Sequence, residues 1–385
     1  MMNWQLQNFD QQAFIRDYWQ KKPCLIRQAF ADVVSPISPE ELAGLACEED
    51  VHSRLVMEKG GTGPWQLKYG PFKEADFLSL PDSHYSLLVS ECEKWLPEFT
   101  DLLDSFRFLP KWRIDDVMIS YAPAGGSVGP HIDEYDVFLL QIEGQRNWQY
   151  DTARLDHPTL IPDLDLAILE SFNAQQSAIL EPGDMLYLPP GIPHHGVAVD
   201  GCMTCSVGFR APTATEVLES FALEIDKREL GAQRYRDPDL ETNRHTAEIT
   251  SAEISNFRRM VENLLDQPDS LWLDSIGKLL SDTVVDESAD ESKFTNFEQL
   301  LADEWMINPD SKILYHCDNT TIRLYCNGQV TELAHTKNRL NAVQQLCTDI
   351  ELPVFLIKQC QQDPALSQLL LDMVNRNALI PLIDE

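Results

Sequence analysis

The sequence predicts an α+β protein in which short strands form a barrel or sandwich, helices follow, and a small mixed domain ends the chain. Three observations support this prediction. Short apolar runs bounded by Gly and Pro continue from residue 112 to 209, as in barrels and sandwiches. Helical periodicity begins after Pro212, and roughly the last hundred residues combine helices with one hairpin. We therefore expect domains at residues 1–212, 213–285 and 286–385.

Length and composition indicate a globular protein of two or three domains. The chain has 385 residues, more than a single ordinary core accommodates, and 43% of them are hydrophobic. No apolar run approaches the length of a membrane span. The first residues, Met1-Met2-Asn3-Trp4, lack the basic and then apolar pattern of a signal peptide. We expect a cytoplasmic protein without a membrane anchor.

The net charge restricts the class of partner. A formal charge of −32 argues against nucleic acid as the main partner, because phosphate binding requires clustered Lys and Arg. Such a surface attracts a basic protein, for example a ribosomal protein or a histone. The alternative is that the acidic residues only keep the protein soluble.

The elements of the first domain follow from residue spacing. Phe14, Tyr18 and Trp19 recur at helical spacing before Pro23, which predicts a helix and then an extended segment at 24–26. Residues up to about 110 mix short helices and strands. Beyond them we expect strands at 117–121, 137–142, 148–150, 185–188 and 204–209.

Two amphipathic helices are expected after residue 212. Thr213 and Glu216 have the spacing of a capping box at the start of the first helix. Apolar residues then recur on one face of each helix: Val217, Leu218, Phe221 and Ile225 in the first, and Ile254, Phe257, Val261, Leu264 and Leu265 in the second. These faces are expected to pack on each other or on a second chain. The acidic stretch 286–292 is interpreted as a linker.

The C-terminal domain combines helices with a hairpin. Ile322, Leu324 and Cys326 alternate before an Asn327-Gly328 turn. Helices are expected at 297–301, 340–348, 352–361 and 366–375. This arrangement resembles a winged helix, a fold that often binds DNA. Because the segment 340–348 has only Arg339 as a nearby base, we interpret the domain as a protein-interaction module.

The nine cysteines are scattered along the chain, and we expect them to be reduced and mostly buried. Cys202 and Cys205 have the Cys-x-x-Cys spacing of a metal or redox pair, and no second such pair accompanies them. On a strand, residues three apart point to opposite faces, so we expect neither a zinc site nor a redox pair there.

A metal site is predicted by two separate segments. His131 and Asp133 are two residues apart on a strand-like run, so both side chains are expected on the same face. His194 is the expected third ligand. Two imidazoles and one carboxylate form the facial triad of non-haem iron(II) oxygenases, which leaves positions open for cosubstrate and dioxygen.

A His-x-acid triplet has little weight alone, because chance supplies about 1.4 of them in a chain of this composition. His316-x-Asp318 is a second one, which we interpret as a turn. The segment from Gly183 to His194 is more specific, since Gly, five residues, Pro-x-Gly, two residues and His match the second motif of the cupin proteins. His195, the alternative ligand, is expected to point the other way.

Arg146 extends the site to a cosubstrate. It lies at the expected start of a strand that pairs with the ligand-bearing one, where its guanidinium can bind the distal carboxylate of 2-oxoglutarate in a bidentate manner. Ser120 is expected to add a hydroxyl. The alternatives are a surface salt bridge for Arg146 and an ordinary strand hydroxyl for Ser120.

These motifs resemble the Jumonji-C 2-oxoglutarate oxygenases, and more narrowly the bacterial ribosomal oxygenases, over nearly the whole chain. The segments that carry the resemblance are Asp17-Tyr18-Trp19-x-Lys21-Lys22-Pro23, Asp115-Asp116-Val117-Met118-Ile119-Ser120, Gly129-Pro130-His131-x-Asp133-x-Tyr135-Asp136-Val137-Phe138 and Ser206-Val207-Gly208-Phe209-Arg210-Ala211-Pro212. The resemblance implies a cupin-type double-stranded β-helix, a helical dimerisation region with a homodimer, and a C-terminal winged helix.

The resemblance also implies an activity: 3-hydroxylation of an arginine in the sixteenth protein of the large ribosomal subunit, with iron(II) and 2-oxoglutarate. His131, Asp133 and His194 occupy the iron-ligand positions and Arg146 the 2-oxoglutarate position, where eukaryotic histidine hydroxylases of the family carry Lys. The alternatives are a histidyl or lysyl hydroxylase of another basic protein and a non-catalytic dimeric cupin scaffold. Four acids are expected at the barrel mouth as partners of a guanidinium: Asp115, Asp116, Glu134 and Asp136.

Overall fold

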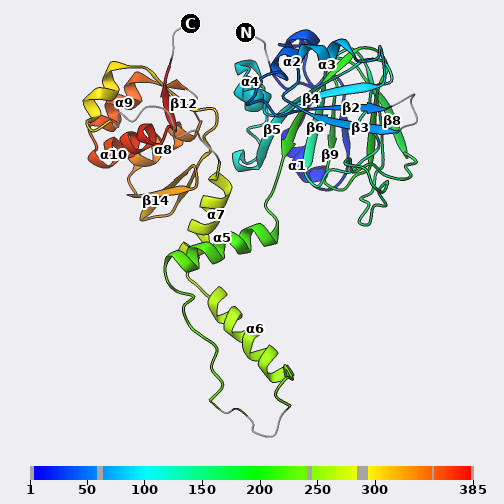
Figure 1. The fold of residues 1–385 in the computed structure, drawn as a ribbon. Coiled ribbons are helices and arrows are strands. Elements are labelled where there is room, and N and C mark those ends of the chain that lie inside the picture. The colour runs from blue at the N-terminus through cyan, green and yellow to red at the C-terminus, as the bar shows by residue number, and fades with distance from the viewer. Residues whose placement is uncertain are drawn as a thin grey trace. The chain divides into compact units, whose positions relative to one another are not determined.

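The computed structural model describes residues 4–58, 64–238, 240, 245–283, 294–348 and 351–382. The chain forms two compact units, Met1–Ala211 and Pro212–Glu385 (Figure 1). The division of the second unit into a dimerisation region and a winged helix remains a prediction. The expected acidic linker at 286–292 lies outside the described residues.

The first unit contains short helices and eleven strands within the described residues. Its helices are α1 (Gln11–Asp17), α2 (Pro39–Leu45), α3 (Glu74–Leu78), η2 (Cys92–Lys94), α4 (Pro97–Asp104) and η3 (Lys111–Arg113). Its strands are β1 (Cys24–Ile26), β2 (Ser53–Glu58), β3 (Trp65–Tyr69), β4 (Tyr85–Val89), β5 (Ile114–Ala122), β6 (Asp136–Glu143), β7 (Arg146–Tyr150), β8 (Gln176–Leu180), β9 (Met185–Leu188), β10 (His194–Ala198) and β11 (Cys202–Phe209).

These strands form two facing sheets. The larger sheet has the order β1-β9-β6-β11-β5-β4-β2-β3, and the smaller has the order β10-β7-β8. Apolar side chains from both sheets form a common cluster between them: Val137, Leu139, Leu186 and Leu188 from the larger sheet, and Trp148, Tyr150 and Leu180 from the smaller. The sheets therefore enclose an interior, as expected for a barrel of short strands.

The other face of the larger sheet is covered by the N-terminal helices. Phe14 of α1, Leu42 of α2 and Phe99 of α4 belong to one buried cluster with Phe138 and Tyr187 of the sheet. A strand buried on both faces has an apolar run without alternation. This explains why residues 137–142 are apolar at every position except Gln141, which faces the interior and accepts a hydrogen bond from Thr204 Oγ1 at 3.0 Å.

The second unit begins with three helices, α5 (Ala214–Lys227), α6 (Ser251–Leu265) and α7 (Asp269–Ser281). Thr213 and Glu216 form the capping box expected at the start of α5. The sequence reading missed α7, which packs on α5 through stacked rings of Phe221 and Trp272 with centroids 3.7 Å apart. The apolar positions of α6 that were expected to pack remain largely exposed; they are Ile254, Phe257 and Val261.

The remainder of this unit contains η4 (Phe297–Ala302), β12 (Trp305–Ile307), β13 (Ile313–Cys317), β14 (Thr321–Cys326), β15 (Gln329–Ala334), α8 (Lys337–Thr348), β16 (Glu351–Leu352), α9 (Val354–Gln361), α10 (Pro364–Asn375) and β17 (Leu379–Pro381). The predicted hairpin is confirmed, because Asn327 and Gly328 join β14 to β15 with positive φ angles. The expected helix at 297–301 is a 3-10 helix, a form typical of such short segments. Asp318 caps the turn between β13 and β14, as expected for a structural triplet.

None of the described helices combines the length and the apolar character needed to cross a bilayer.

Asp136 was expected at the barrel mouth, and this expectation is wrong. Its carboxylate is fully buried on the helix-covered side of the larger sheet, 2.7 Å from the guanidinium of Arg113. It also accepts hydrogen bonds from the Tyr187 hydroxyl and from Gln20, which follows α1 in the chain. Asp136 therefore attaches the N-terminal segment to the sheet.

Replacing Arg113 with Ala should destabilise the protein by about 3–5 kcal/mol, because it leaves the Asp136 carboxylate buried without its counterion. Urea unfolding followed by circular dichroism measures the change. Arg16→Ala, which removes an exposed ion pair with Asp17, is the control and should change stability by less than about 1 kcal/mol. An equal effect of both substitutions would contradict the structural role given to Asp136.

Candidate metal centre and cosubstrate pocket

One pair of backbone hydrogen bonds creates the centre of the site. His131, between β5 and β6, forms an isolated antiparallel bridge with His194 at the start of β10. Each residue donates its amide to the carbonyl of the other at 3.0 Å. Directly opposed residues of an antiparallel pair carry their side chains on the same face. Segments 63 residues apart in the sequence thus place two imidazoles side by side, with ring centroids 4.2 Å apart.

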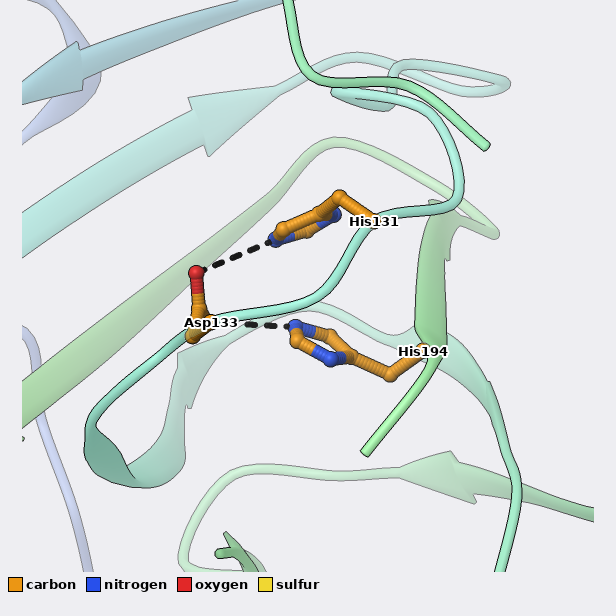
Figure 2. A group of neighbouring side chains, drawn as sticks. All are labelled: His131, Asp133 and His194. Atoms are coloured by element: carbon orange, nitrogen blue, oxygen red, sulfur yellow. Dashed lines mark ion pairs between the residues drawn. The ribbon is translucent and has the colours of Figure 1, made fainter. Parts of the chain in front are cut away.

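The ring nitrogens are oriented by the backbone. His131 Nδ1 lies 2.9 Å from the carbonyl oxygen of Gly129, and His194 Nδ1 lies 2.9 Å from that of Ile192. Because a carbonyl only accepts, each Nδ1 carries the proton and each Nε2 has a free lone pair. The Nε2 atoms lie 3.8 Å and 3.4 Å from the two carboxylate oxygens of Asp133 (Figure 2). Such second contacts fix the rings of metal-binding histidines.

Asp133 is held by the motif that precedes His194. Its carbonyl accepts a 2.8 Å hydrogen bond from the amide of Gly191, the last residue of the Pro189-Pro190-Gly191 turn. Gly191 has φ +81°, a conformation that a residue with a side chain rarely adopts. Asp133 lies in a loop and not on the strand expected from its spacing. Tertiary hydrogen bonds, and not strand alternation, place it beside both imidazoles.

The environment keeps His194 neutral. Burial, and then the neighbouring His131, lower the pKa of His194 to about 4. A neutral imidazole with a free Nε2 is the form that coordinates a metal. His195 points away from the triad, as expected, and its Nε2 lies 2.9 Å from the hydroxyl of Ser127. The structure therefore favours His194 over His195 as the third ligand.

The donor set is suited to iron(II). Ligand atoms of His131, Asp133 and His194 lie within 4.8 Å of one another, and no other group of three potential ligands does so among the described residues. Cys202 and Cys205, the alternative pair, are buried in separate clusters on opposite faces of the sheet. Two imidazoles and one carboxylate gathered on one side match the facial triad and leave other coordination positions to small molecules.

Arg146 is a buried cation that has no anionic partner among the described residues. It is 5% exposed, and its Nε and Nη2 atoms have no hydrogen-bond partner among the described residues. Its Nη1 donates to the Ser120 hydroxyl at 3.4 Å. An unpaired charge in the interior is costly unless a bound anion compensates it. Since no described carboxylate pairs with Arg146, the salt-bridge alternative fails and a carboxylate ligand is indicated.

Strand alternation directs Arg146 toward the metal centre. Arg146, Trp148 and Tyr150 are the buried positions of β7, and Tyr150 is the register partner of His194 on β10. Trp148 lies between them, with its ring centroid 5.8 Å from that of His194 and 5.8 Å from the Arg146 guanidinium carbon. The cation and the triad thus line one continuous interior.

The sequence reading missed Trp148 and Gly196 as parts of this wall. Trp148 is buried, and its indole N–H has no hydrogen-bond partner among the described residues. A Cβ at Gly196 would lie 2.7 Å from the Trp148 ring, so only glycine leaves room for the indole. Trp148 could have been predicted from the sequence, because it stands two residues after Arg146 and therefore shares its face of the strand.

A β-bulge in β5 determines where Asp115 and Asp116 lie on the sheet. Val207 pairs with Val117 and Phe209 with Ile114, so Asp115 and Asp116 both oppose Gly208. A Cβ on Gly208 would lie 3.3 Å from the Asp116 carboxylate, which places this acid on the interior face. Burial, and then Asp115, raise the pKa of Asp116 to about 6.

The two remaining acids lie elsewhere. Glu134 is mostly exposed, with its carboxylate 3.7 Å from Arg154, and Asp136 lies on the opposite face of the sheet. Asp115 and Asp116 are therefore the candidate partners of a substrate cation.

Comparison with known proteins identifies the class of this domain. A family model described as JmjC domain matches residues 101–217. The matched segment contains the triad, Ser120 and Arg146. The candidate metal centre and the buried cation thus belong to a JmjC domain.

Two curated relatives define the family more narrowly. The ribosomal protein uL16 3-hydroxylase of Escherichia coli is 43% identical over 256 residues, which cover 66% of this chain and 67% of that protein. The probable ribosomal oxygenase of Haemophilus influenzae is 32% identical over 341 residues, covering 83% of this chain and 81% of that protein. The chain belongs to the ribosomal oxygenase family.

Solved structures have the same fold over nearly the whole length. An X-ray structure of Escherichia coli YcfD matches with a TM-score of 0.84 and 34% identity, covering 98% of this chain and 99% of that one. YcfD, described as a ribosomal oxygenase, in complex with cobalt and 2-oxoglutarate matches with a TM-score of 0.82 and 33% identity over 98% and 99% of the two chains. The predicted JmjC fold is confirmed.

Replacing Asp133 with Ala should weaken cobalt(II) binding by more than about 100-fold, since even loss of a residue that only orients a ligand costs 10–100-fold. Titration calorimetry measures the affinity, and circular dichroism verifies that the variant folds. His195→Ala is the matched control and should bind cobalt(II) like the wild type. The assignment of the third ligand fails if His195→Ala loses the metal and His194→Ala retains it.

Replacing Arg146 with Met should separate binding from stability. The affinity for 2-oxoglutarate should fall by about 2–5 kcal/mol, the usual effect of removing one side of a buried charge pair. The ligand-free protein should keep its stability or gain about 1 kcal/mol or more, because a buried unpaired charge disappears. Thermal unfolding with and without 2-oxoglutarate measures both quantities. A structural role for Arg146 predicts the opposite, a less stable ligand-free protein.

Proposed function

We propose that the chain is an iron(II)- and 2-oxoglutarate-dependent hydroxylase that oxidises an arginine of ribosomal protein uL16, the sixteenth protein of the large subunit, at its 3-position. Membership of the ribosomal oxygenase family and the name of the Escherichia coli relative support this proposal. The observation that carries it is the buried Arg146, whose Nε and Nη2 donors have no partner among the described residues and lie in the same interior as the His-Asp-His triad.

His131, Asp133 and His194 would hold iron(II), and Arg146 with Ser120 would bind the distal carboxylate of 2-oxoglutarate. The bound metal supplies the activation of dioxygen, while oxidation of 2-oxoglutarate to succinate and carbon dioxide supplies the electrons. The two carbonyls that accept from the Nδ1 atoms keep both rings in the coordinating tautomer. The enclosed interior excludes water and holds one C–H bond in position, which decides the site of oxidation.

The substrate side of the interior is acidic. Asp115 and Asp116, displayed by the bulge beside Gly208, can bind a guanidinium through charge-assisted hydrogen bonds. The charge of −32 favours the approach of a basic protein over that of a nucleic acid. The cytoplasmic location remains a prediction from the sequence.

The activity is tested with the full chain, iron(II), 2-oxoglutarate and air on a panel of ribosomal proteins. Mass spectrometry should find one added oxygen on one arginine of uL16, with succinate formed in equal amount. Omission of 2-oxoglutarate and the variant Asp133→Ala are the controls and should give no product. An added oxygen on a histidine or a lysine would assign the alternative hydroxylase. If no protein of the panel is oxidised, the hydroxylase proposal fails and the non-catalytic scaffold is the alternative that stands.

We also propose that the chain is a homodimer joined through α6. Its apolar stripe is largely uncovered by the described residues: Ile254, Phe257 and Val261 are 53%, 49% and 52% exposed, although Phe257 stacks on Tyr235 with ring centroids 4.5 Å apart. A helix with an uncovered apolar face is stabilised by packing on a partner. The sequence left open whether this face packs on another helix of the chain or on a second chain. The exposure of these residues favours a second copy of the chain.

The variant with both Phe257→Asp and Val261→Asp should be a monomer, because two carboxylates would be buried in the apolar interface. Light scattering after size exclusion gives the mass. Leu78→Asp, which alters an exposed leucine of α3, is the control and should leave the dimer intact. A wild-type chain that is already monomeric at micromolar concentration would exclude this interface.

A further inference from the structure

A groove lies at the free edge of the larger sheet. The cavity has a volume of about 350 Å³ and is lined on one side by residues 65–68 of β3 and on the other by Asp163, Leu164 and Asp165. Consecutive residues of β3, whose side chains alternate between the two faces of the sheet, all line the cavity. The groove thus faces the backbone edge of β3 and not one surface of the sheet.

The edge of β3 offers unpaired backbone groups to this groove. β3 ends the strand order and pairs only with β2 among the described strands. The amide of Gly70 donates to the carbonyl of Ser53, which makes Lys68 and Gln66 the hydrogen-bonded positions of the pair. The N–H and C=O groups of Trp65, Leu67 and Tyr69 therefore point away from β2. An extended peptide can add to such an edge as a further strand.

The opposite wall of the groove is attached to the metal centre. Residues 159–170 form a small hairpin, closed by hydrogen bonds between Ile161 and Ile168 and between Glu170 and Thr159. Leu169 in its second arm donates to the carbonyl of Pro130, the residue before His131. The hairpin thus connects a metal ligand to the groove, with Asp163 and Asp165 in its tip.

The chemistry of the groove selects a basic segment. Asp163 and Asp165 are exposed, and neither makes an ion pair with another described residue. The nearest cation of the strand, Lys68, has its ammonium 4.0 Å from Asp76. Trp65 and Leu67 are half-buried and add apolar surface. Cationic side chains of a bound strand would meet the two carboxylates, while its backbone pairs with β3.

We propose that this groove binds an extended, basic segment of the protein substrate that flanks the oxidised residue. The proposal rests on the proposed function for the identity of the substrate, and it names the surface outside the reacting centre that holds it. The paired backbone supplies affinity without regard to sequence, and the acidic hairpin selects basic segments.

The test compares two labelled peptides of uL16 on the full chain loaded with cobalt(II) and 2-oxoglutarate. The long peptide carries the reacting arginine with its basic flanks, and the short one is cut back to the residues next to that arginine. Fluorescence anisotropy should show that the long peptide binds more tightly. The variant with both Asp163→Asn and Asp165→Asn should weaken the long peptide about fivefold at low salt, as expected for two exposed ion pairs, and leave the short peptide unchanged.

Backbone pairing is tested separately. Leu67→Pro removes an outward N–H without touching the bonds to β2, so it should weaken only the long peptide. Methylation of alternate amide nitrogens in the long peptide should likewise weaken its binding to the wild-type chain. This second measurement does not require that a variant of the chain folds. The control variant Glu49→Gln with Asp101→Asn changes the net charge equally on the helix-covered side and should bind normally.

Equal affinity of the long and short peptides for the wild type would overturn the proposal, as would an unchanged affinity of the double aspartate variant. These readouts measure binding and not oxidation. A wild-type chain that oxidises uL16 but binds both peptides equally would refute the groove alone. A chain that binds the long peptide through the groove but oxidises nothing would refute the proposed function alone.

Discussion

The reciprocal hydrogen bonds between His131 and His194 are the constraint on which the site depends. They join the loop after β5 to the first residue of β10, and they fix the separation of the two rings before any metal is present. Each Nδ1 is then directed to a carbonyl two residues earlier in its own segment. The Gly191 amide adds Asp133 to this framework. The candidate ligands are thus preorganised by backbone bonds, which no side-chain substitution removes directly.

The side chains of the enclosed interior are suited to a negatively charged ligand. Arg146 and Trp148 follow one another on the inward face of β7, and both have buried donors without partners among the described residues. Donors in a protein interior are normally satisfied, so two residues with unpaired buried donors beside the His-Asp-His triad indicate a bound ligand. Burial between the two sheets lowers the pKa of His194, and it also leaves the Nε and Nη2 atoms of Arg146 without a partner among the described residues.

The two faces of the larger sheet carry acidic residues in different surroundings. On its helix-covered face, Asp136 is paired with Arg113 and holds the N-terminal segment. On its inner face, a bulge sets Asp115 and Asp116 opposite Gly208, and the Asp116 carboxylate lies on this face. Acidic residues of two strands in one sheet therefore have different surroundings, according to the face on which each strand displays them. The same sheet continues to β3, whose open edge provides the groove proposed for the flanking segment.

The sequence by itself determined the strand-rich first unit, the identity of the three candidate ligands and the choice of His194, because turn residues and fixed motif offsets are local signals. It also selected Arg146 and Ser120. Only the tertiary structure decided that Asp133 reaches the triad through a loop, that Asp136 is buried on the helix-covered face of the larger sheet, and that Arg146 has no counterion among the described residues. Those facts depend on which strands pair and where a bulge shifts the register. A carboxylate in a sequence does not reveal which face of a sheet it will occupy, because that is fixed by contacts between segments far apart in the chain.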